Sequence, residues 1–163
     1  MEFDQRLERA IERGQRQRDN DSRERALQAM TEEECKNIHS KARLELTEHI
    51  EACLHKLADY FPGFEFETLI SADGWGARIH RDDLGPGSPG TKGFIHFYSH
   101  LEMLVKPYSS SRIVELVARG AIRNKEVISR THFQQLCQID MEVYREIIDQ
   151  WTLEYAERFS ARA

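Results

Sequence analysis

Apolar residues recur along this chain with two different periods, and each period predicts a different kind of element. Between residues 35 and 60 they return every three or four positions, which predicts a long amphipathic helix ending near Phe61. Thr31 and Glu34 form a capping-box pattern at its start, and Pro62-Gly63 ends it. A helix of about 30 residues extends ~45 Å, which is long enough to cross a whole sheet.

Beyond residue 64 the apolar period is two, which is typical of strands. The predicted strands cover residues 64–71, 75–80, 94–106, 113–123 and 127–130. Asp73-Gly74 is a favoured hairpin turn, and residues 124–126 predict another. The glycine- and proline-rich stretch 84–93 predicts a surface loop, either a plain connection or a flap over the next strand. Connections this short predict antiparallel pairing throughout.

A second capping-box pattern, from Thr131 to Gln134, predicts the start of the last helix. The apolar stripe expected on this helix is Leu136, Ile139, Val143, Ile147, Trp151 and Tyr155, broadened by Ile148 and Phe159. Together the elements predict an α+β fold, in which long amphipathic helices cover one face of a five-stranded antiparallel sheet.

The first 28 residues predict a charged helical extension, separate from a single domain over residues 29–163. Residues 2–25 contain seven arginines and seven acidic residues, and acid–arginine pairs four positions apart would stabilise a solvated helix. Only Phe3, Leu7 and Ile11 could pack against a neighbour. The extension is therefore either mobile or an arm that docks on another surface.

The overall composition limits the classes of function. A formal charge of −5 argues against a general nucleic-acid binder, even though Arg119 and Arg123 could form a small basic patch. Cys35, Cys53 and Cys137 show no CxxC spacing or cysteine–histidine cluster, so we expect buried free thiols in a reducing compartment. Neither a secretory signal nor an apolar run of about 20 residues is visible, so a cytoplasmic protein without a membrane span is expected.

The strand over residues 94–106 has two contrasting faces. One face is Ile95, Phe97, Ser99, Leu101, Met103 and Val105, and the other is Phe94, His96, Tyr98, His100, Glu102, Leu104 and Lys106. If this segment were a helix, His96 and His100 would form a one-turn metal pair. Its period of two and its β-branched and aromatic residues favour a strand, in which these histidines lie ~13–14 Å apart and cannot share an ion. No metal or cofactor is therefore expected.

The polar face of that strand is the predicted recognition surface. The candidate binding residues are His96, Tyr98, His100, Glu102, Arg119 and Arg123. Aromatic, imidazole and guanidinium groups together suit an anionic or aromatic ligand or a protein partner. The alternative is an ordinary half-solvated sheet surface with cross-strand ion pairs. A one-residue slip of register would exchange the two faces.

No complete catalytic motif is present in the sequence. Residues 85–92 depart from a phosphate-binding loop, and His80-Arg81-Asp82 stands without the other kinase motifs. The sequence therefore predicts a small, non-catalytic, cytoplasmic binding or adaptor module that forms a homodimer through its long helices. The alternative is a small enzyme that uses His96, His100 or Glu102 as acid–base or metal-ligand groups.

Overall fold

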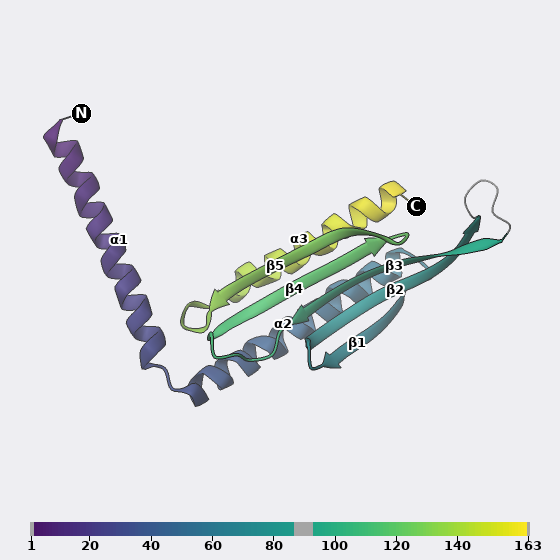
Figure 1. Cartoon of the computed structure of the whole chain (residues 1–163), viewed down its shortest axis with the longest axis horizontal. Coiled ribbons are helices and arrows are strands. Elements are labelled where there is room, and N and C mark those ends of the chain that lie inside the picture. Colours follow the sequence, from purple (N-terminus) through teal and green to yellow (C-terminus); the bar gives the residue numbers. More distant parts are fainter. Residues whose placement is uncertain (1, 87–92, 163) are drawn as a thin grey trace.

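The fold is an open antiparallel sheet with two helices on one face and a third helix projecting away (Figure 1). A computed structural model describes residues 2–86 and 93–162 of the chain. Its elements are α1 (Phe3–Ala29), α2 (Glu32–Tyr60), β1 (Glu65–Ser71), β2 (Gly74–Pro86), β3 (Phe94–Val105), β4 (Ile113–Ile122), β5 (Lys125–Gln135), a short 3-10 turn (Leu136–Gln138) and α3 (Met141–Arg162). The α+β prediction, with its five-stranded antiparallel sheet, is confirmed.

The five strands follow one another in space in the same order as in the sequence. Ser71 pairs with Gly74 across the first hairpin, where Gly74 has a φ of 145° that side chains rarely tolerate. Arg123 and Asn124 form the last hairpin with φ values of 50° and 70°, which is the backbone of a tight primed turn. The observed turn therefore begins one residue before the predicted one, which covered residues 124–126.

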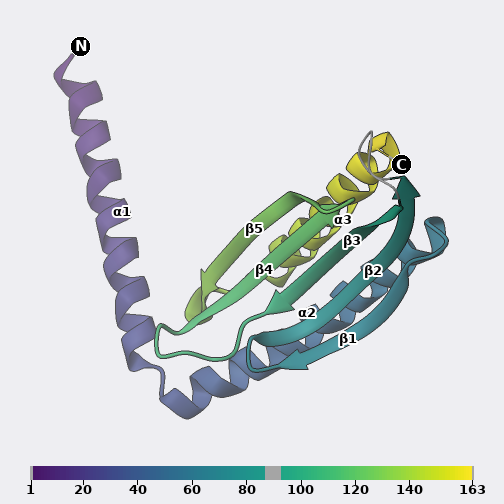
Figure 2. The ribbon, with the colours of Figure 1, turned by 45° about the vertical axis from the view of Figure 1, so that its right-hand side comes forward.

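The strand interpretation of residues 94–106 is confirmed, and so is the assignment of its two faces. Ser99, Leu101, Met103 and Val105 are all completely buried between the sheet and the helices. The alternate residues lie on the opposite side of the sheet, which no helix covers in the views of Figures 1 and 2. Ile95 belongs to the apolar set by parity, but it is exposed because the β2–β3 hairpin extends past the other strands.

The core lies between the sheet and the helices α2 and α3. From α2 it contains Cys35, Ala42, Leu46, Ile50 and Leu57, as the apolar period predicted, and also Leu54. Ile38 and Tyr60 share that period but are exposed, and Cys53 is only partly buried. Two tyrosines of α3 attach that helix to β4: Tyr144 donates a hydrogen bond to the Val114 carbonyl (2.7 Å) and Tyr155 donates one to the Ala121 carbonyl (2.9 Å). The predicted cap of α2 is also present, because Thr31 Oγ1 accepts a hydrogen bond from the Glu34 amide.

The predicted start of the last helix is wrong. Residues 131–135 continue β5, whose backbone pairs with β4, and α3 begins only at Met141. Asp140 provides the cap, since its Oδ1 accepts hydrogen bonds from the amides of Glu142 and Val143. A capping box is a local signal, and here the ladder with β4 satisfies the same backbone groups instead. The buried stripe of α3 is consequently Tyr144, Ile148, Trp151, Tyr155 and Phe159.

Strand β2 also runs further than predicted, because Leu84, Gly85 and Pro86 pair with the start of β3. The expected loop or flap therefore shrinks, and its remaining part, residues 87–92, lies outside the described residues.

Helix α1 confirms the helical part of the extension, and Figures 1 and 2 both show it projecting from one end of the sheet-and-helix body. Phe3, Leu7 and Ile11 are exposed, so nothing in this structure covers that short stripe. Near its C-terminal end, Arg112 Nη1 donates a hydrogen bond to the Met30 carbonyl (2.8 Å). None of the described helices combines the length and apolar character that a membrane span requires.

A buried histidine gives the fold a predictable pH dependence. His39 is 1% exposed, its Nε2 lies 3.1 Å from the Lys106 carbonyl, and burial together with nearby Arg43 lowers its pKa. Below about pH 6.5, the usual histidine pKa, His39 is protonated in the unfolded chain but stays neutral in the folded chain. The free energy of unfolding therefore falls as the pH falls. We expect the melting temperature of both proteins to drop when the pH is lowered from about 7 to 5. The drop should be smaller for His39→Gln than for the unmodified protein. An equal drop in both would contradict this role for His39.

Candidate functional site

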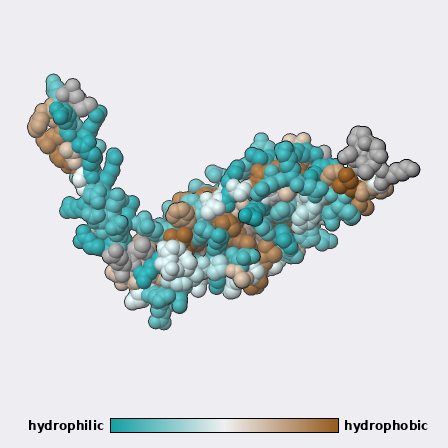
Figure 3. Space-filling model, in the orientation of Figure 1, coloured by the Kyte–Doolittle hydropathy of each residue, from teal (hydrophilic) through white to brown (hydrophobic). Residues whose placement is uncertain are grey.

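The face of the sheet away from α2 and α3, here called the open face, presents side chains in register across neighbouring strands. In the orientation of Figure 1, Figure 3 shows this side as largely hydrophilic with apolar patches between. One row reads Glu67, Arg78, Glu102, Arg119 and Ser129 from β1 to β5, and the next reads Leu69, Gly76, Leu104, Val117 and Thr131. The open face is therefore a charged row beside an apolar row.

The charged row leaves one arginine unpaired. Arg78 lies between two acids, bonded to Glu67 and 3.9 Å from Glu102 Oε2. Arg119 stands opposite Glu102 on β4, yet within the described part of the chain no hydrogen bond or ion pair holds its guanidinium. Because the carboxylate of Glu102 lies beside Arg78 and not in an ion pair with Arg119, the guanidinium of Arg119 can donate hydrogen bonds to a ligand.

A shallow hollow of about 610 Å³ lies beside Arg119 on the open face. Its lining combines hydroxyl, charged and apolar groups: Ala72, Asp73, Glu102, Leu104, Lys106, Pro107, Val117, Ala118, Arg119, Ser129, Arg130 and Thr131. Two of the cations in this lining form ion pairs: Lys106 Nζ is 3.0 Å from Glu115, and Arg130 Nη2 is 2.7 Å from Glu154. Arg119 is thus the cation in this lining that has no acidic partner among the described residues.

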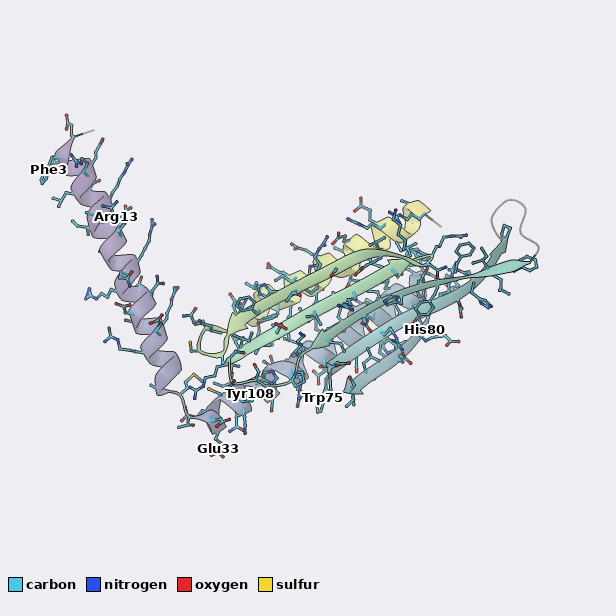
Figure 4. The ribbon with its side chains drawn as sticks, viewed as in Figure 1. Phe3, Arg13, Glu33, Trp75, His80 and Tyr108 are labelled. Atoms are coloured by element: carbon cyan, nitrogen blue, oxygen red, sulfur yellow. The ribbon has the colours of Figure 1, made fainter. Side chains whose placement is uncertain are left out.

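Aromatic and imidazole rings occupy the next part of the open face. Tyr98 and His100 stack with ring centroids 5.3 Å apart, and His80, labelled in Figure 4, lies 6.1 Å from Tyr98. Burial lowers the pKa of His100, and it raises the pKa of Tyr98, so both rings are neutral at pH 7. Nδ1 of His100 is buried without a hydrogen-bond partner among the described residues, which is an unfavourable state for a polar atom.

The structure brings together four of the six predicted binding residues. Tyr98, His100, Glu102 and Arg119 share the open face on β3 and β4. His96 is on the same face but in the extended hairpin, six residues from Glu102 along β3 and thus ~20 Å away. It lies 3.9 Å from Asp82 and is largely exposed.

Arg123 does not belong to this group. Its guanidinium lies over the Phe97 ring, 4.3 Å from the centroid, and its amide donates a hydrogen bond to Ser99 Oγ. Phe97 and Ser99 alternate with the open-face residues, so Arg123 lies on the helix side of the sheet. The left-handed turn at Arg123 breaks the alternation from which its face was inferred.

Ser129 and Thr131 complete the hollow and were not foreseen as candidates. The sequence of residues 131–135 resembles the start of a helix, so the predicted strand ended at residue 130. A strand of four residues is too short for its side chains to be assigned to a face. A period-two alternation could have assigned Ser129 and Thr131 to the open face. These two residues alternate with Ile128, Arg130, His132 and Gln134.

Comparisons with protein-family models, curated proteins and solved structures found no significant match to this chain.

A second group of polar side chains lies on the helix side of the molecule. His49 and Cys53, one turn apart on α2, meet Asp149 of α3, and His49 Nε2 is 2.8 Å from Asp149 Oδ1. The expectation of buried cysteines without a histidine neighbour is therefore wrong for Cys53, which is half-buried beside His49. The HxxxC spacing on a predicted helix was a visible signal, but only the packing of α3 on α2 supplies the aspartate.

The chemistry of this second group differs from that of a cysteine nucleophile. Burial, together with Asp149, raises the pKa of the Cys53 thiol to about 12, so the sulfur is protonated at neutral pH. In a catalytic triad the acid binds the ring nitrogen away from the nucleophile, whereas here both contacts involve Nε2 of His49. Among the described residues, this is the one set of three or more histidine, cysteine or acidic groups close enough together to hold an ion.

Proposed function

We propose that this protein is a non-catalytic binding module whose open face binds a carboxylate or phosphate group carried on an apolar body. The observation that supports this most directly is Arg119, a cation in the lining of the hollow that has no acidic partner in the part of the chain that the structure describes. The hydroxyls of Ser129 and Thr131 can add hydrogen bonds to the same group. Such a group can belong to a small ligand or to a segment of a partner protein.

The surroundings of Arg119 favour a singly charged head over a polyanion. Leu104 and Val117 provide an apolar floor for the body of the ligand, and Tyr98 and His100 extend the surface with stacked rings. Glu102 and Asp73 line the same hollow and would repel additional negative charge. A nucleic-acid backbone therefore fits this surface poorly.

The alternative of a small enzyme has weaker geometric support. His96 is too far from Glu102 to act on one reacting group with it, and the neutral His100 lies against Tyr98 without a nucleophile beside it in the described residues. We therefore favour binding over catalysis as the role of the open face.

Two further parts of the proposal concern location and assembly. The free thiols Cys35, Cys53 and Cys137 fit a reducing compartment, which supports a cytoplasmic location. Ile38 and Leu44 are exposed apolar residues of α2, which supports the proposed homodimer through the helices.

Phenylacetate is a suitable probe, because it joins an aromatic body to a singly charged carboxylate. We expect its titration to shift the backbone amide resonances of Arg119, Ser129 and Thr131 in a saturable way. In Arg119→Gln we expect an affinity at least about tenfold weaker, since a hydrogen bond to a charged group contributes ~1.5–3 kcal/mol and 1.4 kcal/mol is a factor of ten. Two-dimensional NMR spectroscopy measures both.

The matched control is Arg145→Gln on α3. Arg145 is also a surface arginine, but it pairs with Glu142 and lies on the helix side. Its replacement should leave the titration unchanged. Resonance shifts spread over both faces, or equal affinity in Arg119→Gln, would refute the proposed site.

A further inference from the structure

The cluster of His49, Cys53 and Asp149 has three different donor atoms at one point between two helices. Cys53 Sγ is 3.6 Å from His49 Nε2 and 3.3 Å from Asp149 Oδ1, and the third side of the triangle measures 2.8 Å. Two donors come from successive turns of α2 and the third comes from α3, so the cluster joins elements almost a hundred residues apart in sequence.

This triangle has nearly the dimensions of one face of a zinc tetrahedron. With Zn–S bonds of about 2.3 Å, Zn–N bonds of ~2.0–2.1 Å and Zn–O bonds of ~2.0–2.2 Å, tetrahedral angles place sulfur ~3.6 Å from both nitrogen and oxygen. Nitrogen and oxygen would lie ~3.4 Å apart. His49 and Asp149 therefore have to separate by about 0.6 Å, and Cys53 and Asp149 by about 0.3 Å.

The surrounding core holds the three donors in place. Ile50 and Leu54, next in sequence to His49 and Cys53, are completely buried, and so is Ile148 beside Asp149. The backbone at all three positions is therefore fixed by packing, and only side-chain rotations are needed to admit an ion.

The donor set selects among metals. Imidazole nitrogen, thiolate sulfur and carboxylate oxygen are all zinc ligands, whereas magnesium and calcium require oxygen donors. Asp149 Oδ1 now lies within hydrogen-bonding distance of both the His49 ring and the Cys53 thiol. A divalent ion would replace these hydrogen bonds with direct bonds: the thiol proton is released to solvent, and the neutral imidazole keeps its proton on Nδ1 instead of Nε2.

A fourth coordination position would face an apolar hollow of about 400 Å³. Two of the three donors, Cys53 and Asp149, line this hollow together with Lys56, Leu57, Tyr60, Phe61, Thr152, Leu153 and Ala156. Three protein ligands with one open position are characteristic of zinc sites that bind water or an exogenous ligand, whereas structural sites have four protein ligands.

We propose that His49, Cys53 and Asp149 bind one zinc ion between α2 and α3, with its fourth position open to this hollow. The site lies on the helix side of the sheet, so it is independent of ligand binding on the open face.

Cobalt(II) reports both the ligands and the geometry. When the chelator-treated protein is titrated with Co²⁺, we expect one equivalent to produce a thiolate-to-cobalt charge-transfer band and the intense visible absorption of a four-coordinate ion. One equivalent of Zn²⁺ should abolish both, and Zn²⁺ should raise the melting temperature. Weak visible absorption without charge transfer, or no saturation at one equivalent, would overturn the proposal.

Single substitutions test the three ligands. Asp149→Asn keeps the side-chain shape at a half-exposed position, and Cys53→Ser removes the sulfur; each should weaken zinc affinity at least about 100-fold, measured by competition with a chromophoric chelator. Cys137→Ser is the matched cysteine control and should bind zinc normally. Unchanged affinity in Asp149→Asn, with its metal-free melting curve intact, would exclude the carboxylate as a ligand.

Azide tests the open position. Its addition to the cobalt form should change the visible spectrum, because azide can take the fourth position. An unchanged spectrum would show that the position is closed and would overturn that part of the proposal. Arg119→Gln should bind zinc like the unmodified protein, so failure of the open-face proposal and failure of the zinc proposal are distinguishable.

Discussion

Replacing Gly76 with alanine is expected to destabilise the fold by about 3 kcal/mol or more, which is a large part of the 5–15 kcal/mol typical of a domain. A β-carbon at this position would lie 1.8 Å from the Met103 carbonyl oxygen and 3.0 Å from Leu104 Cα. Both obstacles are backbone atoms of β3, so the clash can be relieved only if β2 and β3 move apart. Chemical denaturation followed by circular dichroism measures the loss.

Gly14→Ala is the matched control for this effect. No heavy atom lies within 4 Å of a β-carbon built at Gly14, which is in the exposed helix α1. Alanine favours a helix over glycine by about 1 kcal/mol, so this change should leave the domain stable and raise helicity slightly. If the two variants unfold at the same denaturant concentration as the unmodified protein, β2 and β3 do not approach as closely as the structure shows.

The second large effect is expected at Tyr155. Its ring is completely buried, stacks on Phe159 with centroids 6.1 Å apart and meets Phe64 edge-on, and its hydroxyl bonds to the Ala121 carbonyl. Tyr155→Ala removes the ring and leaves a cavity under Gly120, so we expect a loss of about 3–5 kcal/mol. Equilibrium unfolding in urea provides the measurement.

Tyr155→Phe separates the contribution of the hydroxyl to stability from that of the ring. The aromatic packing stays, while the Ala121 carbonyl loses its hydrogen-bond donor in a buried place, so we expect a smaller loss of about 1–3 kcal/mol. A loss in Tyr155→Phe as large as that in Tyr155→Ala would contradict the view that the ring dominates the stabilisation by this residue.

The open face was predictable where one side of a strand is buried. The alternation in β3 placed Tyr98, His100 and Glu102 away from the core, because residues such as Leu101 and Met103 fix the register. Arg119 followed in the same way from its neighbours on β4. Its lack of an acidic partner was not predictable, since that depends on the row in which Arg78 already lies beside Glu102.

Local sequence patterns gave wrong predictions where pairing within the sheet satisfies the same backbone groups. The capping-box pattern at Thr131 is helical in isolation, yet pairing with β4 satisfies the same backbone groups and extends β5. Arg123 was assigned to the wrong face because its left-handed turn interrupts the alternation of a strand.

By itself the sequence determined the elements with strong periodicity: the helix α2 with its Thr31 cap, the order of the strands and the two faces of β3. These features depend on neighbours a few residues apart, and period and turn chemistry encode such neighbours directly. Only the tertiary structure decided which side chains from distant segments meet. Asp149 reaches His49 and Cys53 because α3 packs along α2, and Ser129 joins Arg119 because β5 extends the sheet. Such proximity results from burying whole faces of helices and strands against one another, and no local pattern in the sequence records it.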